Sequence, residues 1–234
     1  MTRDDAELRL FAQLFVDPGR QLGLAEGALL LAAPEYPGLN AAPYLARLDQ
    51  WARRLSDGRP GRPSLPARLD LLYVELGFSG NRGAYYDPRN SFLNQVIERR
   101  TGIPITLGVV VIEVARRAGL GAHGISFPGH FLVGGEGGVV IDPFLGRAVD
   151  PPALEALHVQ AGGSGAPSPA LLRPATSRQI FVRMLQNLRA IYTAEADIPR
   201  LRRVLTRLSL LAPSREVADE LAALDPDGPR RLTN

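Results

Sequence analysis

A histidine and an aspartate stand in two apolar stretches that could pair as neighbouring strands of a hairpin. His130 lies in the sequence FPGHFLV and Asp142 in VVIDPF, with a glycine-rich segment, residues 134–138, between them. If that segment is the connecting loop, pairing is symmetric about Glu136, and His130 lies directly opposite Asp142 on one face of the sheet. A carboxylate in that place orients an imidazole and stabilises its protonated form, as in a nucleophilic triad. The same contact could equally be a structural pair.

A nucleophile is harder to find, because the chain contains no cysteine. This excludes a thiol mechanism, which would use a thiolate at the N-terminus of a helix. Thr106 is the only hydroxyl residue in the first turn of the helix predicted after Pro104, where threonine is also a common capping residue. Ser91 and Ser126 are further candidates without supporting spacing. The remaining chemistry is that of an acyl hydrolase or amidase, in which Thr106 or a water molecule attacks with His130 as the base.

Metal and cofactor chemistry is not favoured by the residues present. The three histidines are His123, His130 and His158, and no HExxH-type pair exists. A site built on the first two would need Asp87 or Asp142 to complete the ligand shell. The glycine-rich segment precedes a predicted strand rather than a helix, which indicates a hairpin turn and not a phosphate loop. We predict neither a metal nor a cofactor.

The composition indicates one substantial core without disulfides. The 234 residues are 45% hydrophobic and include no cysteine. The polar, acidic start, MTRDDAELRL, lacks the features of a signal peptide, and the apolar runs are shorter than a bilayer span. All basic residues are arginine, the net charge is +3, and no basic run is interleaved with aromatic residues. We expect a cytoplasmic protein that binds neither nucleic acid nor membranes.

Hydrophobic periodicity predicts a helical layer, a central helix and then a small antiparallel sheet. The predicted helices are Asp4–Phe15, Gly23–Ala33, Ala41–Leu55, Leu65–Gly77, a helix capped by Asn90 or Ser91 that runs to Arg100, and one that follows Pro104 and ends at Gly119 or Gly121. The predicted strands are Ala122–Phe127, His130–Gly134 and Val139–Phe144. The helix after Pro104 is apolar nearly all round, so we expect it at the centre of the core.

The C-terminal part is predicted to form a separate helical hairpin. The predicted division is a domain at 1–160, a linker rich in Gly, Ser and Pro at 161–175, the hairpin at 176–225 and a tail at 226–234. The hairpin helices are Ser177–Ala194 and Ile198–Leu211, and their apolar positions follow part of the tetratricopeptide pattern. Arg200, Arg203 and Arg207 are expected to form either a solvent-exposed stripe or a docking face for an acidic partner.

Five segments spread over nearly the whole chain form a specific combination. They are EYPGLN (Glu35–Asn40), the stretch Glu75–Leu107, FPGHFLV (Phe127–Val133), IDPF (Ile141–Phe144) and RMLQNLRAIY (Arg183–Tyr192). Together they resemble the SirB-type transglutaminase-like proteins, in which this domain is followed by tetratricopeptide-like helices. The resemblance implies an α/β fold of the papain-like type, in which His130 and Asp142 match the His and Asp of the transglutaminase triad. The Cys of that triad has no counterpart, and the matching helix start ends in Thr106.

The fold class that follows is α/β (α+β): a papain- or transglutaminase-like core with an N-terminal helical layer, a small antiparallel sheet and a C-terminal helix pair. The leading functional hypothesis is a non-catalytic or catalytically altered protein that binds a peptide or protein partner and is regulatory. The expected groove is lined by Asn90, Ser91, Thr106, His130 and Asp142. The alternative is the hydrolase or amidase, with Asp142 orienting His130. A third hypothesis is an adaptor that binds its partner through the helix pair from Ser177 onward.

Overall fold

The computed structural model describes residues 8–9, 11–13, 23–56 and 64–224. Most of the predicted helix Asp4–Phe15 and the tail at 226–234 lie outside the described residues. The chain divides into two compact units, Gly23–Ile180 and a second that comprises Phe181–Asn234 with Met1–Leu22. The boundary between the units falls inside helix α7 (Ser177–Ala194), and the division into separate domains stays a prediction.

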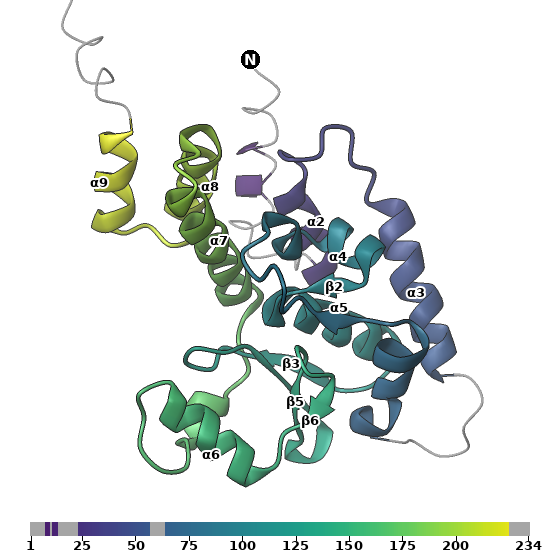
Figure 1. The fold of residues 1–234 in the computed structure, drawn as a ribbon. Helices are drawn as coiled ribbons and strands as arrows, with labels where there is room; N and C mark the ends of the chain where they lie inside the picture. Colours follow the sequence, from purple (N-terminus) through teal and green to yellow (C-terminus); the bar gives the residue numbers. More distant parts are fainter. Residues whose placement is uncertain (1–7, 10, 14–22, 57–63, 225–234) are drawn as a thin grey trace, which may run out of the picture. The chain divides into compact units, whose positions relative to one another are not determined.

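Helix α5, Pro104–Arg117, runs through the middle of the first unit (Figure 1). Proline suits the first helical position, and every residue from Pro104 to Ala115 is buried. The neighbours of α5 include the helices α2 (Leu24–Ala32), α3 (Ala42–Ser56) and α4 (Leu93–Arg99). The sheet lies against α5 on the side away from these helices (Figure 1). Gly119, with φ of +76°, follows the last turn, so the predicted central helix and its end are confirmed.

The segment Leu65–Gly77 does not form the regular α-helix that the sequence predicts. Two other helices predicted in this layer are confirmed as α2 and α3. Leu65–Arg68 forms a 3-10 helix, η1, and Leu71–Glu75 forms a π-helix, η2. In the latter, the amide of Leu76 donates to the carbonyl of Leu71 at 2.9 Å. Such a wide turn shifts the following side chains around the helix axis. Apolar periodicity alone does not reveal it.

The prediction that Asn90 or Ser91 caps helix α4 is wrong. Both residues lie in a 3-10 helix, η3 (Pro88–Ser91), whose capping group is the carboxylate of Asp87. Helix α4 begins only at Leu93, and no side chain caps it. The sequence Asp-Pro at the start of η3 is a good helix-initiating pair, so the first turn forms earlier than expected.

The sheet contains four antiparallel strands in sequence order. They are β3 (Ala122–Ile125), β4 (Leu132–Gly135), β5 (Val140–Asp142) and β6 (Arg147–Ala148). The first three are the predicted strands in shortened form, and β6 was not predicted. A separate parallel ladder pairs β1 (Ser79–Gly80) with β2 (Thr101–Gly102).

The two faces of the sheet are both covered. Val133 of β4 lies on the face near Gly108 of α5, and its neighbour Leu132 packs on the opposite face with Leu154. Leu154 belongs to α6 (Pro151–Gln160), and the 3-10 helix η5 (Pro169–Leu172) adds two leucines to the same cluster. The predicted linker at 161–175 therefore contains an ordered element that contributes to this core.

The predicted register of the hairpin is wrong by a small shift. Val133 pairs with Ile141 and Gly134 with Val140, so the pairing is symmetric about Gly137 rather than Glu136. A 3-10 turn, η4 (Glu136–Gly138), makes the connection, and Gly137 adopts φ of +73° in it. In this register the strand β4 begins after His130, which is consequently not a cross-strand neighbour of Asp142.

A buried acidic residue interrupts the apolar surface of α5. Glu113 lies 2.9 Å from the guanidinium of Arg117, which also contacts Asp49 of α3 at 2.7 Å. Burial raises the pKa of Glu113, and the charge and hydrogen bond of Arg117 oppose that rise. Arg117 is therefore required to balance the negative charge of the buried Glu113 carboxylate.

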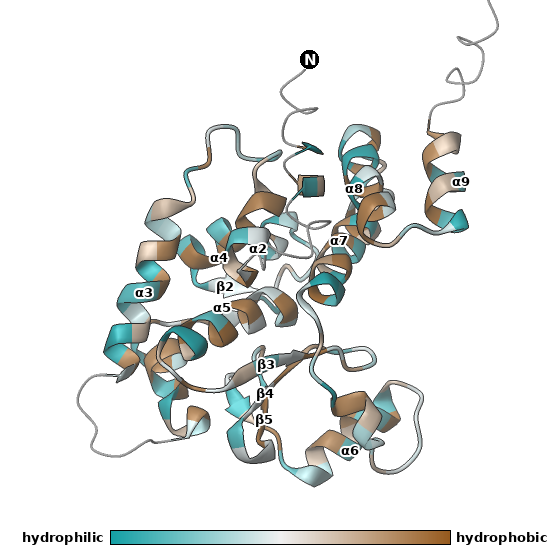
Figure 2. Ribbon diagram, turned by 180° about the vertical axis from the view of Figure 1, so that it is seen from behind, coloured by the Kyte–Doolittle hydropathy of each residue, from teal (hydrophilic) through white to brown (hydrophobic). Residues whose placement is uncertain are grey.

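The second unit is helical where it is described. Helix α7 is followed by α8 (Ile198–Leu211), and both have the predicted bounds. A third helix, α9 (Arg215–Ala223), was not predicted and is joined to α7 by ion pairs of Arg189 with Glu216 and Glu220. Apolar and polar residues alternate around α7 and α8 (Figure 2). Among the described residues, no helix is long and apolar enough to cross a membrane.

The expected arginine stripe on α8 is wrong for one of its three members. Arg207 is only 6% exposed, its guanidinium lies 5.8 Å from the ring of Phe11, and it donates to the carbonyl of Arg203 at 3.0 Å. Arg200 is exposed but donates to Asp197 at 2.8 Å. A docking face on this helix would therefore be built mainly on Arg200 and Arg203.

We predict that Arg117→Met lowers the free energy of unfolding by about 3 kcal/mol, because it leaves Glu113 buried without its partner. Arg116→Met is the matched control, since Arg116 is exposed, and its effect should stay within about 0.5 kcal/mol. Urea denaturation of both variants at neutral pH measures the difference. Equal stability of the two variants would show that Glu113 needs no ion pair.

Candidate functional site

The structure brings the side chains of His130 and Asp142 together. Nε2 of His130 lies 3.1 Å from Oδ2 of Asp142, and the side chains are 21% and 5% exposed, respectively. Within the residues that the structure describes, Nδ1 of His130 makes no hydrogen bond. The imidazole is therefore partly exposed. Its Nε2 is held by a buried carboxylate, and its Nδ1 is available for a hydrogen bond or a proton transfer.

A tight turn rather than strand pairing places His130. The amide of His130 donates to the carbonyl of Phe127 at 3.1 Å, with Pro128 and Gly129 as the central residues. Gly129 has φ of +66°, which fits the third position of a type II turn. The turn carries the chain out of line with β4 and presents the imidazole at the end of β5.

The carboxylate of Asp142 is held on its other oxygen by two backbone amides. Oδ1 accepts from Phe144 at 2.8 Å and from Leu145 at 3.1 Å. Burial by itself raises the pKa of Asp142, but the hydrogen bond and charge of His130, together with the two amides, lower it below its usual value. Asp142 is therefore ionised near neutral pH and able to orient the imidazole.

Tyr73 supports this site, although nothing in the sequence singled it out. Its hydroxyl donates to the carbonyl of Pro143 at 2.7 Å. A β-carbon on Gly146 would lie 2.4 Å from its ring, so a glycine is required there. Burial, and then the charge of Asp142, raise the pKa of Tyr73, so it stays a protonated donor. Tyr73 belongs to the π-helix η2. Its contact with Pro143 could not be predicted from the sequence, because it joins segments far apart in the chain.

Thr106 is in the wrong surroundings for a nucleophile. It is 0% exposed, and its hydroxyl lies 2.5 Å from the carbonyl of Asn90 and 3.2 Å from that of Ile103. Among the described residues, no hydrogen bond joins Thr106 to His130. The hydroxyl proton is used to satisfy backbone carbonyls, so the predicted triad is not assembled.

Asn90 and Ser91, which were predicted to contact a partner, do not reach the surface. They are 0% and 1% exposed. The amide of Asn90 donates to the carbonyls of Ala84 and Tyr85 at 2.7 and 3.1 Å and accepts from Asn81 at 3.0 Å. Asn90 therefore organises the preceding loop. The predicted groove is wrong in this part, because four of its five residues, all except His130, are buried.

An open cavity lies beside Asp142 instead. Its volume is about 320 Å³, and it is bounded by the turn after β5, strand β6 and helix α6. Arg147 and Asp150 contribute opposite charges to its wall, and Leu145 and Leu157 contribute apolar surface. The volume is at the lower end of the range for small-ligand pockets.

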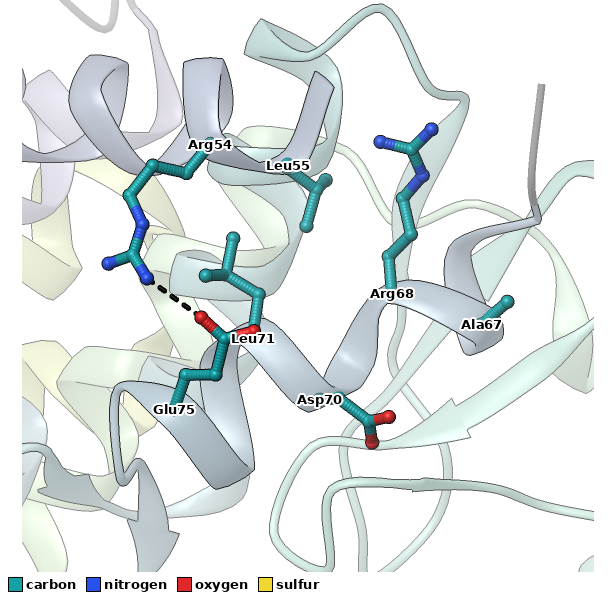
Figure 3. A pocket seen from close by; sticks show the side chains of 7 residues that line it. All are labelled: Arg54, Leu55, Ala67, Arg68, Asp70, Leu71 and Glu75. Carbon is teal, nitrogen blue, oxygen red and sulfur yellow. Dashed lines mark hydrogen bonds and ion pairs between the residues drawn. The ribbon is translucent and has the colours of Figure 1, made fainter. Parts of the chain in front are cut away.

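A smaller cavity of about 140 Å³ lies along η1 and η2 (Figure 3). Arg54 donates to Glu75 at 2.8 Å, whereas Asp70 points away from the guanidinium of Arg68 (Figure 3). The charged groups do not converge on one point, so this cavity offers no evident catalytic arrangement. In the described part of the chain, no group of three His, Asp or Glu side chains could hold a metal ion.

Comparison with known proteins agrees with this architecture. Residues 42–186 match the transglutaminase-like superfamily. A UPF0162 protein of Xylella fastidiosa (strain Temecula1) is 40% identical over 223 residues, which cover 90% of this chain and 79% of the relative. The chain belongs to the transglutaminase-like superfamily, and within it to the group of UPF0162 proteins.

Two further relatives mark the breadth of this similarity. The UPF0162 protein PA3419 of Pseudomonas aeruginosa is 31% identical over 179 residues, 74% of this chain and 66% of the relative. Human F-box only protein 21 is 42% identical over 69 residues, which are 30% of this chain and 11% of that protein. No solved structure matches the chain.

We predict that Asp142→Asn destabilises the protein in a pH-dependent way. Because the pKa of Asp142 is lower in the folded protein than its unfolded value of about 3.9, its charge stabilises the fold above that pH. The stabilisation is lost as the pH falls through the folded pKa. The difference in unfolding free energy between wild type and variant should therefore be largest at pH 6 and shrink toward about pH 3.

Chemical denaturation at several pH values measures this difference. Asp150→Asn is the control, because Asp150 lies on the same cavity but is exposed. A difference that does not change with pH would contradict the lowered pKa.

Proposed function

We propose that this chain is a non-catalytic, SirB-type member of the superfamily that binds a peptide or protein partner at the cavity beside Asp142. The observation that carries the proposal is the state of Thr106. Its hydroxyl is buried and engaged with the carbonyl of Asn90, and the chain has no cysteine to take its place. At the start of helix α5, as the structure describes it, the His130–Asp142 pair thus has neither a thiol nor an available hydroxyl to activate.

The cavity has the mixed character that peptide recognition needs. Leu145 and Leu157 supply apolar surface for a side chain, while Arg147 and Asp150 supply charged groups for the polar backbone or for charged neighbours. His130 does not line this cavity, but it contacts Asp142, which does, and it has a ring nitrogen available for a hydrogen bond. A regulatory role follows from binding without turnover.

A water-based hydrolase is the second candidate, and the available Nδ1 of His130 favours it. This nitrogen could remove a proton from water while Nε2 stays on Asp142. General base catalysis alone contributes about 100-fold or somewhat more, which is small for an enzyme. Thr106 takes no part in this reaction, because its hydroxyl is buried and bonded to the carbonyl of Asn90.

The proposal predicts a partner contact at the cavity. A photo-crosslinking amino acid at Leu145, which lines the cavity, should capture one defined partner in cells that naturally produce the protein. The same group at Val74, 74% exposed and on η2, should not capture it. Ala153→Trp, which fills the cavity, should abolish the crosslink, whereas Glu155→Trp on the exposed side of α6 should not.

Two outcomes would contradict the proposal. Turnover of ester or amide substrates that falls at least about 100-fold in His130→Ala would identify a hydrolase. Capture of the partner from Arg200 on α8 instead of Leu145 would favour an adaptor that acts through the C-terminal helices.

A further inference from the structure

The cavity of about 140 Å³ along η1 and η2 is lined by a buried cation (Figure 3). Arg68 of η1 is only 9% exposed, whereas the other charged residues of the lining, Arg54, Asp70 and Glu75, are exposed. Water stabilises an exposed charge, but a buried charge requires a partner in the protein or a bound ligand. The contacts of Arg68 therefore determine what this cavity can bind.

Within the described part of the chain, the guanidinium of Arg68 has no hydrogen-bond or ion-pair partner. Its Nε is buried and unpaired. The acids of the lining do not supply a partner, because Glu75 pairs with Arg54 and Asp70 points away (Figure 3). The two terminal nitrogens of Arg68 are not fully enclosed, so they are accessible from the cavity that Arg68 lines.

Arg117 shows that an unpaired Nε alone is not unusual in this protein. Its Nε is also buried without a hydrogen bond, but its terminal nitrogens contact Asp49 at 2.7 Å and Glu113 at 2.9 Å. Protein carboxylates thus balance the charge of Arg117. Arg68 is buried more deeply and contacts no carboxylate of the described residues, which indicates that a ligand supplies its counter-charge.

The lining restricts the chemistry of that ligand. A planar guanidinium binds a carboxylate through two parallel hydrogen bonds. Leu55, Ala67 and Leu71 add apolar surface, which suits a short alkyl group. Asp70 and Glu75 repel a doubly charged ligand such as phosphate more strongly than a single carboxylate. A cavity of about 150 Å³ holds a molecule the size of benzene, so this one has room for roughly six non-hydrogen atoms.

The backbone geometry beside this cavity is a second indication of a binding site. Leu71 and Glu75, which line the cavity, are the first and last residues of the π-helix η2. π-helices are rare and occur frequently at functional sites. The same helix also supports the turn after β5 through Tyr73.

We propose that this cavity binds a small monocarboxylic acid of about four to six non-hydrogen atoms, with its carboxylate on Arg68 and its alkyl group against Leu55 and Leu71. The Arg54–Glu75 pair stays intact and adds no net charge. None of the lining residues borders the cavity beside Asp142, so this site does not rest on the proposed function.

A stability measurement tests whether Arg68 has a partner in the protein itself. Arg68→Met keeps the apolar stem and removes the buried charge, so the melting temperature in chloride buffer should stay within about 1 °C of wild type or rise. Arg117→Met is the matched control and should lower it by about 6 °C or more, because it leaves Glu113 unpaired. Equal destabilisation by both changes would overturn the proposal.

One carboxylate close to this site in the sequence, Asp57, lies outside the described residues. Asp57→Asn should leave both the melting temperature and ligand binding unchanged. A loss of stability as large as that of Arg117→Met, together with no effect of carboxylates on wild type, would identify Asp57 as the counter-charge of Arg68 and overturn the proposal.

The binding test follows the melting temperature of the full chain while chloride is replaced by acetate, propionate or butyrate at constant ionic strength. A ligand that binds only the folded state raises this temperature, and about 100 mM of the best of the three acids should raise it by about 5 °C in wild type. Arg68→Met should show no rise. Butyramide, which has the shape of butyrate without its charge, should have no effect. Ala153→Trp, which fills the other cavity, should respond as wild type does.

Four results would overturn this site. They are no rise with any of the three acids, an equal rise in wild type and Arg68→Met, an equal rise with butyrate and butyramide, and a larger rise with inorganic phosphate than with the carboxylates. A rise that is lost in Ala153→Trp but kept in Arg68→Met would also overturn it, because it would place the acid in the cavity beside Asp142.

Discussion

The burial of helix α5 on all sides is the constraint on which the rest of the structure depends. Every polar group on a helix in this position must be satisfied within the protein. Glu113 is therefore paired with Arg117, and the hydroxyl of Thr106 donates to the carbonyl of Asn90. The same constraint that holds the core together removes the hydroxyl from the site where a nucleophile would act. The burial of this hydroxyl and the stability of the core thus have one physical origin.

Much of the fold could be predicted because its signals are local. Helices α5, α7 and α8 were predicted with nearly correct ends, since each has a continuous apolar pattern, and α5 and α8 also have proline in the first turn. The π-helix at Leu71–Glu75 and the hairpin register were not predictable in this way. Both depend on how the segment packs against distant residues, and periodicity contains no information about that.

The candidate site was likewise predictable only where neighbouring residues in the sequence determine the structure, and not where contacts between distant segments do. The sequence placed His130 and Asp142 near each other, but the contact is made through a turn at Pro128 and Gly129 instead of a cross-strand pair. Asn90 and Ser91 have the residue types of a polar groove, yet they are buried. Tyr73 was missed, because its role arises from a single contact between segments far apart in the chain.

We propose that Thr106, at the helix start that matches the position of the transglutaminase cysteine, has a hydroxyl that cannot react. The most direct measurement treats the folded protein with a fluorophosphonate, which labels activated hydroxyl nucleophiles, and determines the intact mass. We expect no adduct on the folded protein, with or without His130. A stoichiometric adduct on Thr106 that disappears in His130→Ala would contradict it and would establish an assembled Thr–His–Asp triad.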